Sequence, residues 1–436
     1  MKLAVIGTGY VGLTQGACLA EIGHEVYCVD VDARKIRDLK KGVLPMYEPG
    51  LEELVLANAA AKRLHFTTDV QSAIEHAEVV FSAVGTPPDK DYRADLSAVR
   101  DVARSFGRYA NGYKVFVNKS TVPVGTGAAC REIIEEEFAK RSVTFSYDQV
   151  SNPEFLREGV AVADCLKPDR IVVGAVTEKA VQIMREVNQP IIDKGAAFFA
   201  TSVESAEIIK YASNTFLATK ITFMNEIAHL CEQVGADVTE VAQGIGLDQR
   251  IGKRFLHAGI GFGGSCFPKD IDALQIIGHD HGYEFEILTA VKKVNDRQKG
   301  VLVEKLLKHL PDLRGLTIAV WGLAFKPKTD DMREAPSCVI IQALVDRGVH
   351  VRAYDPAAMK NARKALPKIL YAKTALKAAR GADALLILTD WDEFRGTDFE
   401  ALKKAMKGRV IGDGRNIWRP QEVRGHGFTY FSIGRV

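Results

Sequence analysis

The sequence predicts an α/β protein with two doubly wound parallel-sheet domains joined by a long central helix. Three observations lead to this prediction. Strand-like apolar runs alternate with helix-length amphipathic segments in both halves of the chain, as in parallel sheets covered by helices. A glycine-rich turn follows the first run. A stretch without Gly or Pro separates the two halves and predicts the helix.

The first half of the chain contains five apolar runs of strand length. Helical segments between them imply a parallel sheet with helices on both faces. Residues 1–200 are therefore predicted to form the first, Rossmann-like domain. The predicted strands are Leu3–Ile6, Glu25–Asp30, Val79–Val84, Lys114–Asn118 and Ile171–Gly174.

The turn after the first run predicts a dinucleotide site. It has the pattern GxGxxG, opens a helix, and is followed by Asp30 at the end of the next strand. Glycines allow a pyrophosphate to approach the backbone, and the acid accepts from a ribose hydroxyl. Because Asp30 would repel a 2′-phosphate, NAD is predicted rather than NADP. The turn residues assigned to the cofactor are Gly7, Gly9, Tyr10, Val11 and Gly12.

The rest of the chain predicts two further domains. One long helix is expected from Val203 to Gly235, within a central helical domain at residues 201–300 that would form a dimer surface. Residues 301–436 repeat the β/α pattern without GxGxxG, which fits a mononucleotide site in a weak internal duplication. Its strands are predicted at Thr317–Trp321, Val349–Asp355 and Ala384–Leu388.

Composition agrees with a cytoplasmic enzyme. The 436 residues are 47% hydrophobic and carry a net charge of +3, which gives no reason to expect nucleic acid or membrane as a partner. The seven cysteines are scattered and lack metal-type spacing, so reduced thiols are expected rather than disulfides or zinc. Neither a secretion signal nor a membrane-length apolar run is recognised.

Cys266 lies in the glycine-dense segment from Gly261 to Asp270. A thiolate there can attack a carbonyl carbon. Taken alone, the segment fits a turn with a small buried apolar side chain better than it fits a nucleophile. Together with a nicotinamide site, the thiol suggests oxidation to the carboxylic acid level through a thiohemiacetal and a thioester.

Four segments in sequence order carry a family resemblance: residues 152–159, 168–174, 210–214 and 264–270. In this order the chain resembles the nucleotide-sugar 6-dehydrogenases of the UDP-glucose/GDP-mannose dehydrogenase family, from Lys2 to about Arg415. The resemblance implies a homodimer that oxidises the sugar C6 alcohol twice with NAD. The segments at 168–172 and 266–269 look more like the branch that converts UDP-glucose to UDP-glucuronate.

The resemblance also implies catalytic roles. Cys266 would be the nucleophile, Lys210 and Asn214 would stabilise the oxyanion, and Asp270 would hold a water or orient Lys210. Glu154 would be the general base and Thr121 would hold a water or relay a proton. From the residues alone, Glu154 and Glu158 equally fit acids in a first helical turn after Pro153.

The remaining site residues bind cofactor or substrate according to the same resemblance. Arg250 matches an arginine delivered from the neighbouring subunit. Beyond the glycine turn and Asp30, the cofactor residues are Lys35, Thr86, Thr121 and Glu158. The substrate residues are Glu154, Phe155, Leu156, Arg157, Lys210, Asn214, Arg250, Phe262, Gly263, Lys326 and Arg415.

Three other functions stay open from the sequence. The first is a dehydrogenase of GDP-mannose or of a UDP-N-acetylhexosamine. The second is a two-electron hydroxyacid or polyol dehydrogenase, which needs no cysteine. The third is a catalytically silent nucleotide-binding protein, against which the joint presence of Lys210, Asn214, Cys266 and Asp270 argues.

Overall fold

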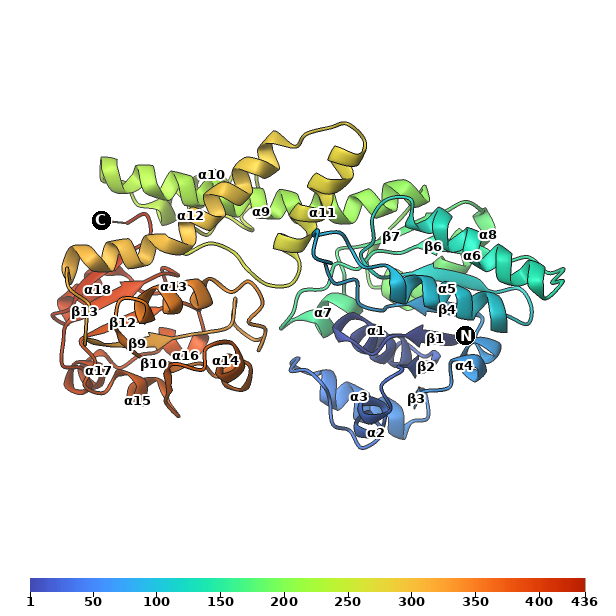
Figure 1. Cartoon of the computed structure of the whole chain (residues 1–436), viewed down its shortest axis with the longest axis horizontal. Coiled ribbons are helices and arrows are strands. Elements are labelled where there is room, and N and C mark those ends of the chain that lie inside the picture. The colour runs from blue at the N-terminus through green and yellow to red at the C-terminus, as the bar shows by residue number, and fades with distance from the viewer. Residues whose placement is uncertain (436) are drawn as a thin grey trace. The chain divides into compact units, whose positions relative to one another are not determined.

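The computed structural model describes residues 1–435 and divides into two compact units (Figure 1). The first unit comprises Met1–Ser213 and Asp272–His281, and the second comprises Asn214–Ile271 and Gly282–Val436. The division of the sequence at residues 200 and 300 into three domains stays a prediction.

The first unit contains an eight-stranded sheet in the order β3-β2-β1-β4-β5-β6-β7-β8. All five strands predicted for this half are confirmed, as β1, β2, β4, β5 and β7. The sheet is not wholly parallel, because β6 pairs antiparallel with β7. The strands are β1 (Lys2–Ile6), β2 (Glu25–Val29), β3 (Leu64–Thr67), β4 (Val79–Ser82), β5 (Val115–Asn118), β6 (Asp148–Ser151), β7 (Arg170–Ala175) and β8 (Ala197–Thr201).

Helices cover both faces of this sheet, and the side chains of β1 alternate between them (Figure 1). Leu3 and Val5 pack with α1 (Tyr10–Glu21), α2 (Ala33–Leu39), α3 (Leu51–Ala60) and α8 (Glu178–Ile192). Ala4 and Ile6 pack with α4 (Val70–His76), α5 (Ser97–Tyr109) and α6 (Thr126–Lys140). A short helix, α7 (Ala161–Leu166), follows β6.

The predicted long helix is confirmed as α9 (Val203–Val234). It ends before Gly235, whose φ of 76° is the left-handed conformation that glycine adopts without strain after a helix. The division between the units falls within this helix, at residues 213 and 214. Three further helices follow: α10 (Val238–Gly246), α11 (Phe267–Asp280) and α12 (Glu286–His309).

The second unit contains a six-stranded parallel sheet in the order β11-β10-β9-β12-β13-β14. This order repeats that of the first six strands of the other sheet, as an internal duplication requires, and the three predicted strands are confirmed as β9, β10 and β12. The strands are β9 (Thr317–Trp321), β10 (His350–Tyr354), β11 (Leu370–Tyr371), β12 (Ala384–Ile387), β13 (Val410–Asp413) and β14 (Thr429–Ser432).

The second sheet is also covered on both faces. Ile318 and Val320 pack with α12, α13 (Pro336–Val345) and α14 (Met359–Ala365). Ala319 and Trp321 face the other way, towards α15 (Ala375–Ala379), α16 (Asp392–Arg395), α17 (Phe399–Ala405) and α18 (Pro420–Gly425). Within residues 1–435, no helix has the length and apolar character needed to cross a membrane.

Candidate active site

The glycine turn between β1 and α1 lies at the point where the strand order reverses. Gly7 has a φ of 101°, and a Cβ there would lie 2.7 Å from the Ala83 carbonyl oxygen after β4. A Cβ on Gly12 would lie 1.9 Å from the Gly7 oxygen. Because Gly9, the N-cap of α1, offers no side-chain cap, the free N–H groups of that helix suit a pyrophosphate.

Asp30, which directly follows β2, is hydrogen-bonded to this turn. Its Oδ2 accepts hydrogen bonds from the Thr8 N–H at 3.0 Å and from Lys35 Nζ at 2.7 Å, and its Oδ1 accepts from the Asp32 N–H. Burial opposes ionisation, but the bonds from Lys35, Thr8 and Asp32 outweigh it and lower the pKa of Asp30 to about 2. Asp30 is therefore an anion, and Lys35 is its counter-ion.

We expect Asp30→Ala to raise the KM for NAD about ten- to a hundredfold, because a hydrogen bond to a charged group is worth about 1.5–3 kcal/mol. The advantage of NAD over NADP should shrink, since the repelling charge is gone. Initial rates with both cofactors measure this. Asp38→Ala, which removes a half-exposed carboxylate of α2 that does not contact Asp30, is the matched control. An unchanged KM for NAD would contradict the assignment of Asp30.

The loops after β4 and β5 are joined by a hydrogen bond between two predicted cofactor residues. Thr86 Oγ1 donates to the Thr121 carbonyl oxygen at 2.8 Å. Lys119, which the sequence analysis did not select, is buried beside them and donates to Asn152 Oδ1 at 3.0 Å. Burial lowers the pKa of Lys119 to about 8, although the nearby Cys165 and Glu154 favour its charged form.

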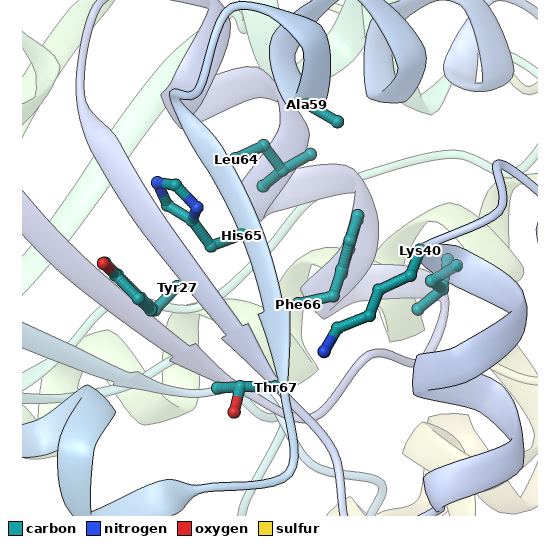
Figure 2. A pocket seen from close by; sticks show the side chains of 8 residues that line it. Tyr27, Lys40, Ala59, Leu64, His65, Phe66 and Thr67 are labelled. Atoms are coloured by element: carbon teal, nitrogen blue, oxygen red, sulfur yellow. The ribbon is translucent and has the colours of Figure 1, made fainter.

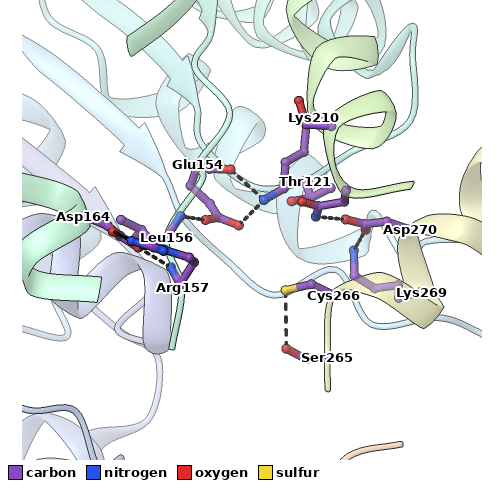
Figure 3. A network of polar contacts seen from close by, with 12 residues as sticks. Thr121, Glu154, Leu156, Arg157, Asp164, Lys210, Ser265, Cys266, Lys269 and Asp270 are labelled. Atoms are coloured by element: carbon purple, nitrogen blue, oxygen red, sulfur yellow. Dashed lines mark hydrogen bonds and ion pairs between the residues drawn. The ribbon is translucent and has the colours of Figure 1, made fainter. Parts of the chain in front are cut away.

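Glu154 and Lys210 form a buried ion pair of 2.8 Å in the first unit (Figure 3). Lys210 Nζ also donates to the Glu154 carbonyl oxygen at 2.6 Å, and the carboxylate accepts from the Leu156 N–H. Burial favours the neutral acid, but the charge and hydrogen bond of Lys210 prevail and lower the pKa of Glu154. The pair is therefore a carboxylate and an ammonium.

The prediction that residues 154–158 form a first helical turn is wrong. The chain runs without regular structure from Asn152 to Arg157, and α7 begins only at Ala161. The reason is visible in the bonds of Glu154, whose side chain binds Lys210 and the Leu156 N–H instead of capping a helix. Arg157 forms an ion pair of 2.6 Å with Asp164.

The Phe155 ring and the Glu48 carboxylate make further contacts with this segment. Lys210 Nζ and the Arg170 guanidinium lie 5.4 Å and 4.1 Å from the centre of the Phe155 ring. Glu48, a buried acid that the sequence analysis missed, accepts from the N–H groups of Gly159 at 2.6 Å and Ala161 at 2.7 Å and from the Tyr10 hydroxyl. Glu48 thus ties the residues next to Glu158 to the first residue of α1.

In the second unit, Cys266 directly precedes α11 and is partly exposed. Asp270, one turn further, is 1% exposed and accepts from Asn214 Nδ2 at 2.6 Å and from Lys269 Nζ at 2.8 Å. Figure 3 shows Lys269 directed at Asp270 and the Cys266 sulfur beside the Ser265 hydroxyl, 3.6 Å away. The N-terminal end of a helix stabilises an anion such as a thiolate.

The loop before Cys266 is packed so closely that Gly263 and Gly264 leave no room for a Cβ atom. A Cβ on Gly263 would lie 2.1 Å from the Glu334 carbonyl oxygen, and one on Gly264 would lie 2.7 Å from the Phe325 ring. Asn295 binds both the N–H and the carbonyl oxygen of Phe262, at 2.9 Å and 3.2 Å. The backbone on the N-terminal side of the thiol is therefore held in one conformation.

Arg415, which follows β13, is hydrogen-bonded to the backbone of the same loop. Its guanidinium donates to the carbonyl oxygens of Leu388 at 2.9 Å, Gly261 at 3.1 Å and Phe325 at 3.3 Å. Burial lowers its pKa, although Asp390 and Asp413 favour the charged form. Lys326 Nζ lies 5.3 Å from the Phe325 ring centre. Arg250, by contrast, has a side chain that is 88% exposed and pairs with Asp248.

The second sheet repeats the glycine and the acid of the first, at the ends of two strands in the half that the sequence analysis predicted to be a weak internal duplication. Gly322 follows β9 with a φ of 90°, and a Cβ there would lie 2.4 Å from Thr389 after β12. Asp355, at the end of β10, is 1% exposed and accepts from the N–H groups of Leu323, Ala324, Ala357 and Ala358 and from the Trp391 indole.

A cavity of about 410 Å³ lies elsewhere, around the edge strand β3 (Figure 2). His65 and Tyr27 lie on one side of that strand, and Phe66 and Lys40 lie on the other. None of its lining residues is a predicted site residue. Within residues 1–435, no three His, Cys, Asp or Glu side chains are arranged to hold a metal ion.

The glycine turn of the first unit, with its ionised acid at the end of the next strand, defines a dinucleotide-binding protein. Models of three domains match the chain. They are the NAD-binding, central and UDP-binding domains of the UDP-glucose/GDP-mannose dehydrogenase family, at residues 1–192, 204–297 and 319–420. The chain belongs to this family.

Named relatives cover the whole chain. The UDP-glucose 6-dehydrogenase of Rhizobium meliloti is 50% identical, with 100% of each chain covered. The UDP-glucose 6-dehydrogenase TuaD of Bacillus subtilis is 50% identical over 100% of this chain and 93% of its own. The structure of a UDP-glucose dehydrogenase from Pyrobaculum islandicum matches with a TM-score of 0.90 and 37% identity, covering 100% of this chain and 98% of its own.

Proposed function

We propose that this protein oxidises C6 of UDP-glucose to a carboxylate and releases UDP-glucuronate. The observation that carries the proposal is Cys266, a partly exposed thiol at the start of α11, on a loop whose glycines have no room for side chains. A thiol is needed to carry an aldehyde on to the acid level, whereas a two-electron dehydrogenase needs none. The names of the relatives support UDP-glucose as the sugar nucleotide.

The thiolate of Cys266 adds to the C6 aldehyde to give a thiohemiacetal, which loses two electrons to become a thioester. Water then cleaves the thioester and restores the thiol. The turn at Gly7 and the Asp30 carboxylate would hold NAD, which when bound would supply the hydride acceptor for each oxidation. The overall change removes four electrons from the C6 alcohol and forms two NADH.

Lys210 and Asn214 supply positive charge and a hydrogen-bond donor to the oxygen on C6. They lie four residues apart on α9, so both project from one face of the helix. Asp270 accepts from Asn214 and thereby fixes the orientation of its amide. We propose that the two side chains act on one oxygen, the alkoxide of the first oxidation and the oxyanion of the thiohemiacetal.

Glu154 is the base for the last step. The carboxylate is already ionised because Lys210 lies 2.8 Å away, so it can take a proton from the attacking water. Thr121 holds that water or relays its proton. Substrate contacts are assigned to Phe155, Leu156, Arg157, Phe262, Gly263, Lys326 and Arg415, with Thr86 and Glu158 on the cofactor side.

Counting cofactor tests this function. UDP-glucose with excess NAD should yield two NADH for each molecule of UDP-glucose consumed. The absorbance at 340 nm measures the NADH. One NADH per substrate would identify a two-electron dehydrogenase instead. UDP-galactose, UDP-N-acetylglucosamine, UDP-N-acetylmannosamine and GDP-mannose are the comparison substrates. Faster turnover of one of these sugar nucleotides than of UDP-glucose would support the proposed four-electron oxidation but assign a different substrate to the protein.

The second unit carries an apolar stripe that supports the proposed homodimer. Phe216, Phe223 and Leu230 lie at seven-residue intervals on α9 and are 64%, 53% and 54% exposed. Residues seven apart lie on one side of a helix, and a stripe of large apolar side chains is usually covered in the assembled protein. We propose that a second copy covers it, in a compartment that keeps the thiols reduced.

We further expect Arg250 to act in the site of the neighbouring subunit. Each homodimer of Arg250→Ala or of Cys266→Ala then has two defective sites, but a mixed dimer regains one intact site. Subunits unfolded together and refolded at equal ratio should recover roughly a quarter of the parental activity. The rate of NADH formation measures this recovery.

Mixing Cys266→Ala with Asp270→Asn is the control for that experiment. Cys266 directly precedes α11 and Asp270 lies in its first turn, so one subunit supplies both and no mixed dimer has an intact site. Recovery in the Arg250 mixture no larger than in this control, in material shown to contain mixed dimers, would place Arg250 in its own subunit's site or outside any site.

A further inference from the structure

Glu207 is a buried acid on α9 that none of the roles above uses. It is 3% exposed, and its carboxylate binds the backbone at the start of α6. Oε2 accepts from the Gly125 N–H at 2.9 Å, and Oε1 accepts from the Gly127 N–H at 3.1 Å. The two partners lie 82 and 80 residues away in sequence, so these bonds join distant parts of the first unit.

The start of α6 depends on Glu207 because it has no local cap. Gly125, its N-cap residue, has no side chain and adopts a φ of 90°, which residues with a Cβ rarely do. A Ser, Thr or Asp cap, the usual way to satisfy the first N–H groups of a helix, is therefore not available at this position. The acceptor comes instead from another helix.

The loop that Glu207 holds is the loop that carries Thr121. This loop leaves β5, passes Thr121 and reaches α6 at Thr126. Its first residues are also held by the bond from Thr86 to the Thr121 carbonyl oxygen and by the bonds from Ser120 to carbonyl oxygens at and just after the end of β4. Glu207 and Lys210 lie three residues apart on α9 and so project from the same side. Lys210 binds Glu154 after β6, and β6 pairs directly with β5.

We infer that Glu207 is a positioning residue, which sets the place of the Thr121 loop relative to Lys210 and Glu154. One helix, α9, thus holds two neighbouring loops through two adjacent side chains, one for each loop. This inference rests on the proposed roles of Thr121 and Glu154. The bonds that carry it do not depend on which sugar nucleotide is the substrate.

Stability alone does not account for a carboxylate here. Burial raises the pKa of Glu207 to about 7, although the bonds from Gly125 and Gly127 favour the anion. The unfolded chain therefore releases this proton at lower pH than the folded protein, so folding is weakened as pH rises from the ordinary value of a glutamate to about 7. The titratable groups near it are Glu204 on α9 and Cys130 on α6.

A double-mutant cycle tests the inference. Glu207→Gln keeps the shape of the side chain but places an amide N–H₂ against one of the two backbone donors. We expect it to lower kcat by about ten- to a hundredfold with little change in the KM for either substrate. Combined with Thr121→Ala, it should add little to the loss that Thr121→Ala causes alone, because both act through the same loop.

Glu204→Gln is the matched control, since Glu204 is an exposed acid one turn earlier on the same helix. Its effect should be small and should add to that of Thr121→Ala. The kcat of the parent should also fall as pH drops through about 7, where Glu207 takes up a proton, and Glu207→Gln should lose that part of the pH profile. Additive effects of Glu207→Gln and Thr121→Ala would overturn the inference.

Hydrogen exchange provides a readout that needs no activity. The amides of residues 120–122 and 124–127 should exchange at least several-fold faster in Glu207→Gln than in the parent or in Glu204→Gln. Unchanged exchange would overturn the inference even if the protein oxidises UDP-glucose. Faster exchange in a protein that oxidises none of the tested sugar nucleotides would instead overturn the proposed function and keep the tie between α9 and this loop.

Discussion

Cys266→Ser should reduce the formation of UDP-glucuronate by roughly a thousandfold or more, as the loss of a covalent nucleophile does. Serine has nearly the same shape, but its alkoxide is much harder to generate than a thiolate, and its ester is a poorer route to the acid than a thioester. Binding should survive, because the loop is held by the contacts of Gly263, Asn295 and Arg415 rather than by the sulfur.

Two measurements make this result specific. NADH formation gives the loss of turnover, and a fluorescence titration with UDP-glucose gives the retained affinity. Cys338→Ser, which changes another partly exposed thiol of the second unit, should have close to parental activity. Production of UDP-glucuronate by Cys266→Ser at close to the parental rate would show that no thioester lies on the pathway.

Glu154→Gln should slow turnover by about a hundred- to ten-thousandfold, the usual loss for a general base, and should trap the acyl-enzyme. A base that acts only in thioester hydrolysis can be removed without stopping the oxidations before it. The amide still accepts a hydrogen bond from Lys210 in place of the ion pair of 2.8 Å. Intact-protein mass spectrometry after mixing with UDP-glucose and NAD should show a glucuronyl adduct.

The double variant Glu154→Gln with Cys266→Ala locates that adduct, because it should show none. A brief burst of two NADH per active site before the slow phase is the kinetic counterpart of the trapped thioester. Glu178→Gln, at the exposed start of α8, is the control with a carboxylate of no proposed role. Slow turnover without any adduct would assign the base to a group other than Glu154.

Local patterns in the sequence were enough to predict the main elements. The glycine turn and the alternating runs predict β1, β2 and both domain folds, because the turn chemistry and the hydrophobic period are properties of short segments. Six strands of two to five residues were missed, namely β3, β6, β8, β11, β13 and β14. The direction of β7 and β8, which run antiparallel to the other six strands of the sheet, was not predicted either. Strand direction depends on the path of the connecting segments and not on the local hydrophobic pattern of the strand.

The candidate site shows the same limit. Cys266 and Asp30 follow from motifs, and the assignments of the remaining site residues stay predictions. Glu48, Glu207 and Lys119 could not be selected from sequence, because an isolated acid or lysine usually lies on the surface. Their importance becomes visible only when folding brings backbone N–H groups or an amide from far along the chain to each of them.

The acid at the end of β10 bears on how the two halves of a duplicated fold diverged. Asp355 occupies the place that Asp30 has in the first sheet, but five donors of its own domain surround it. Asp30 also accepts hydrogen bonds within its own unit, but it is 9% exposed, whereas Asp355 is 1% exposed and more enclosed by its donors. Asp355 thereby fastens the loops that follow β9 and β10 to each other. Giving this half affinity for a dinucleotide would require changes in the loops at 322–324 and 356–358, which supply four of the five donors, and not a single substitution.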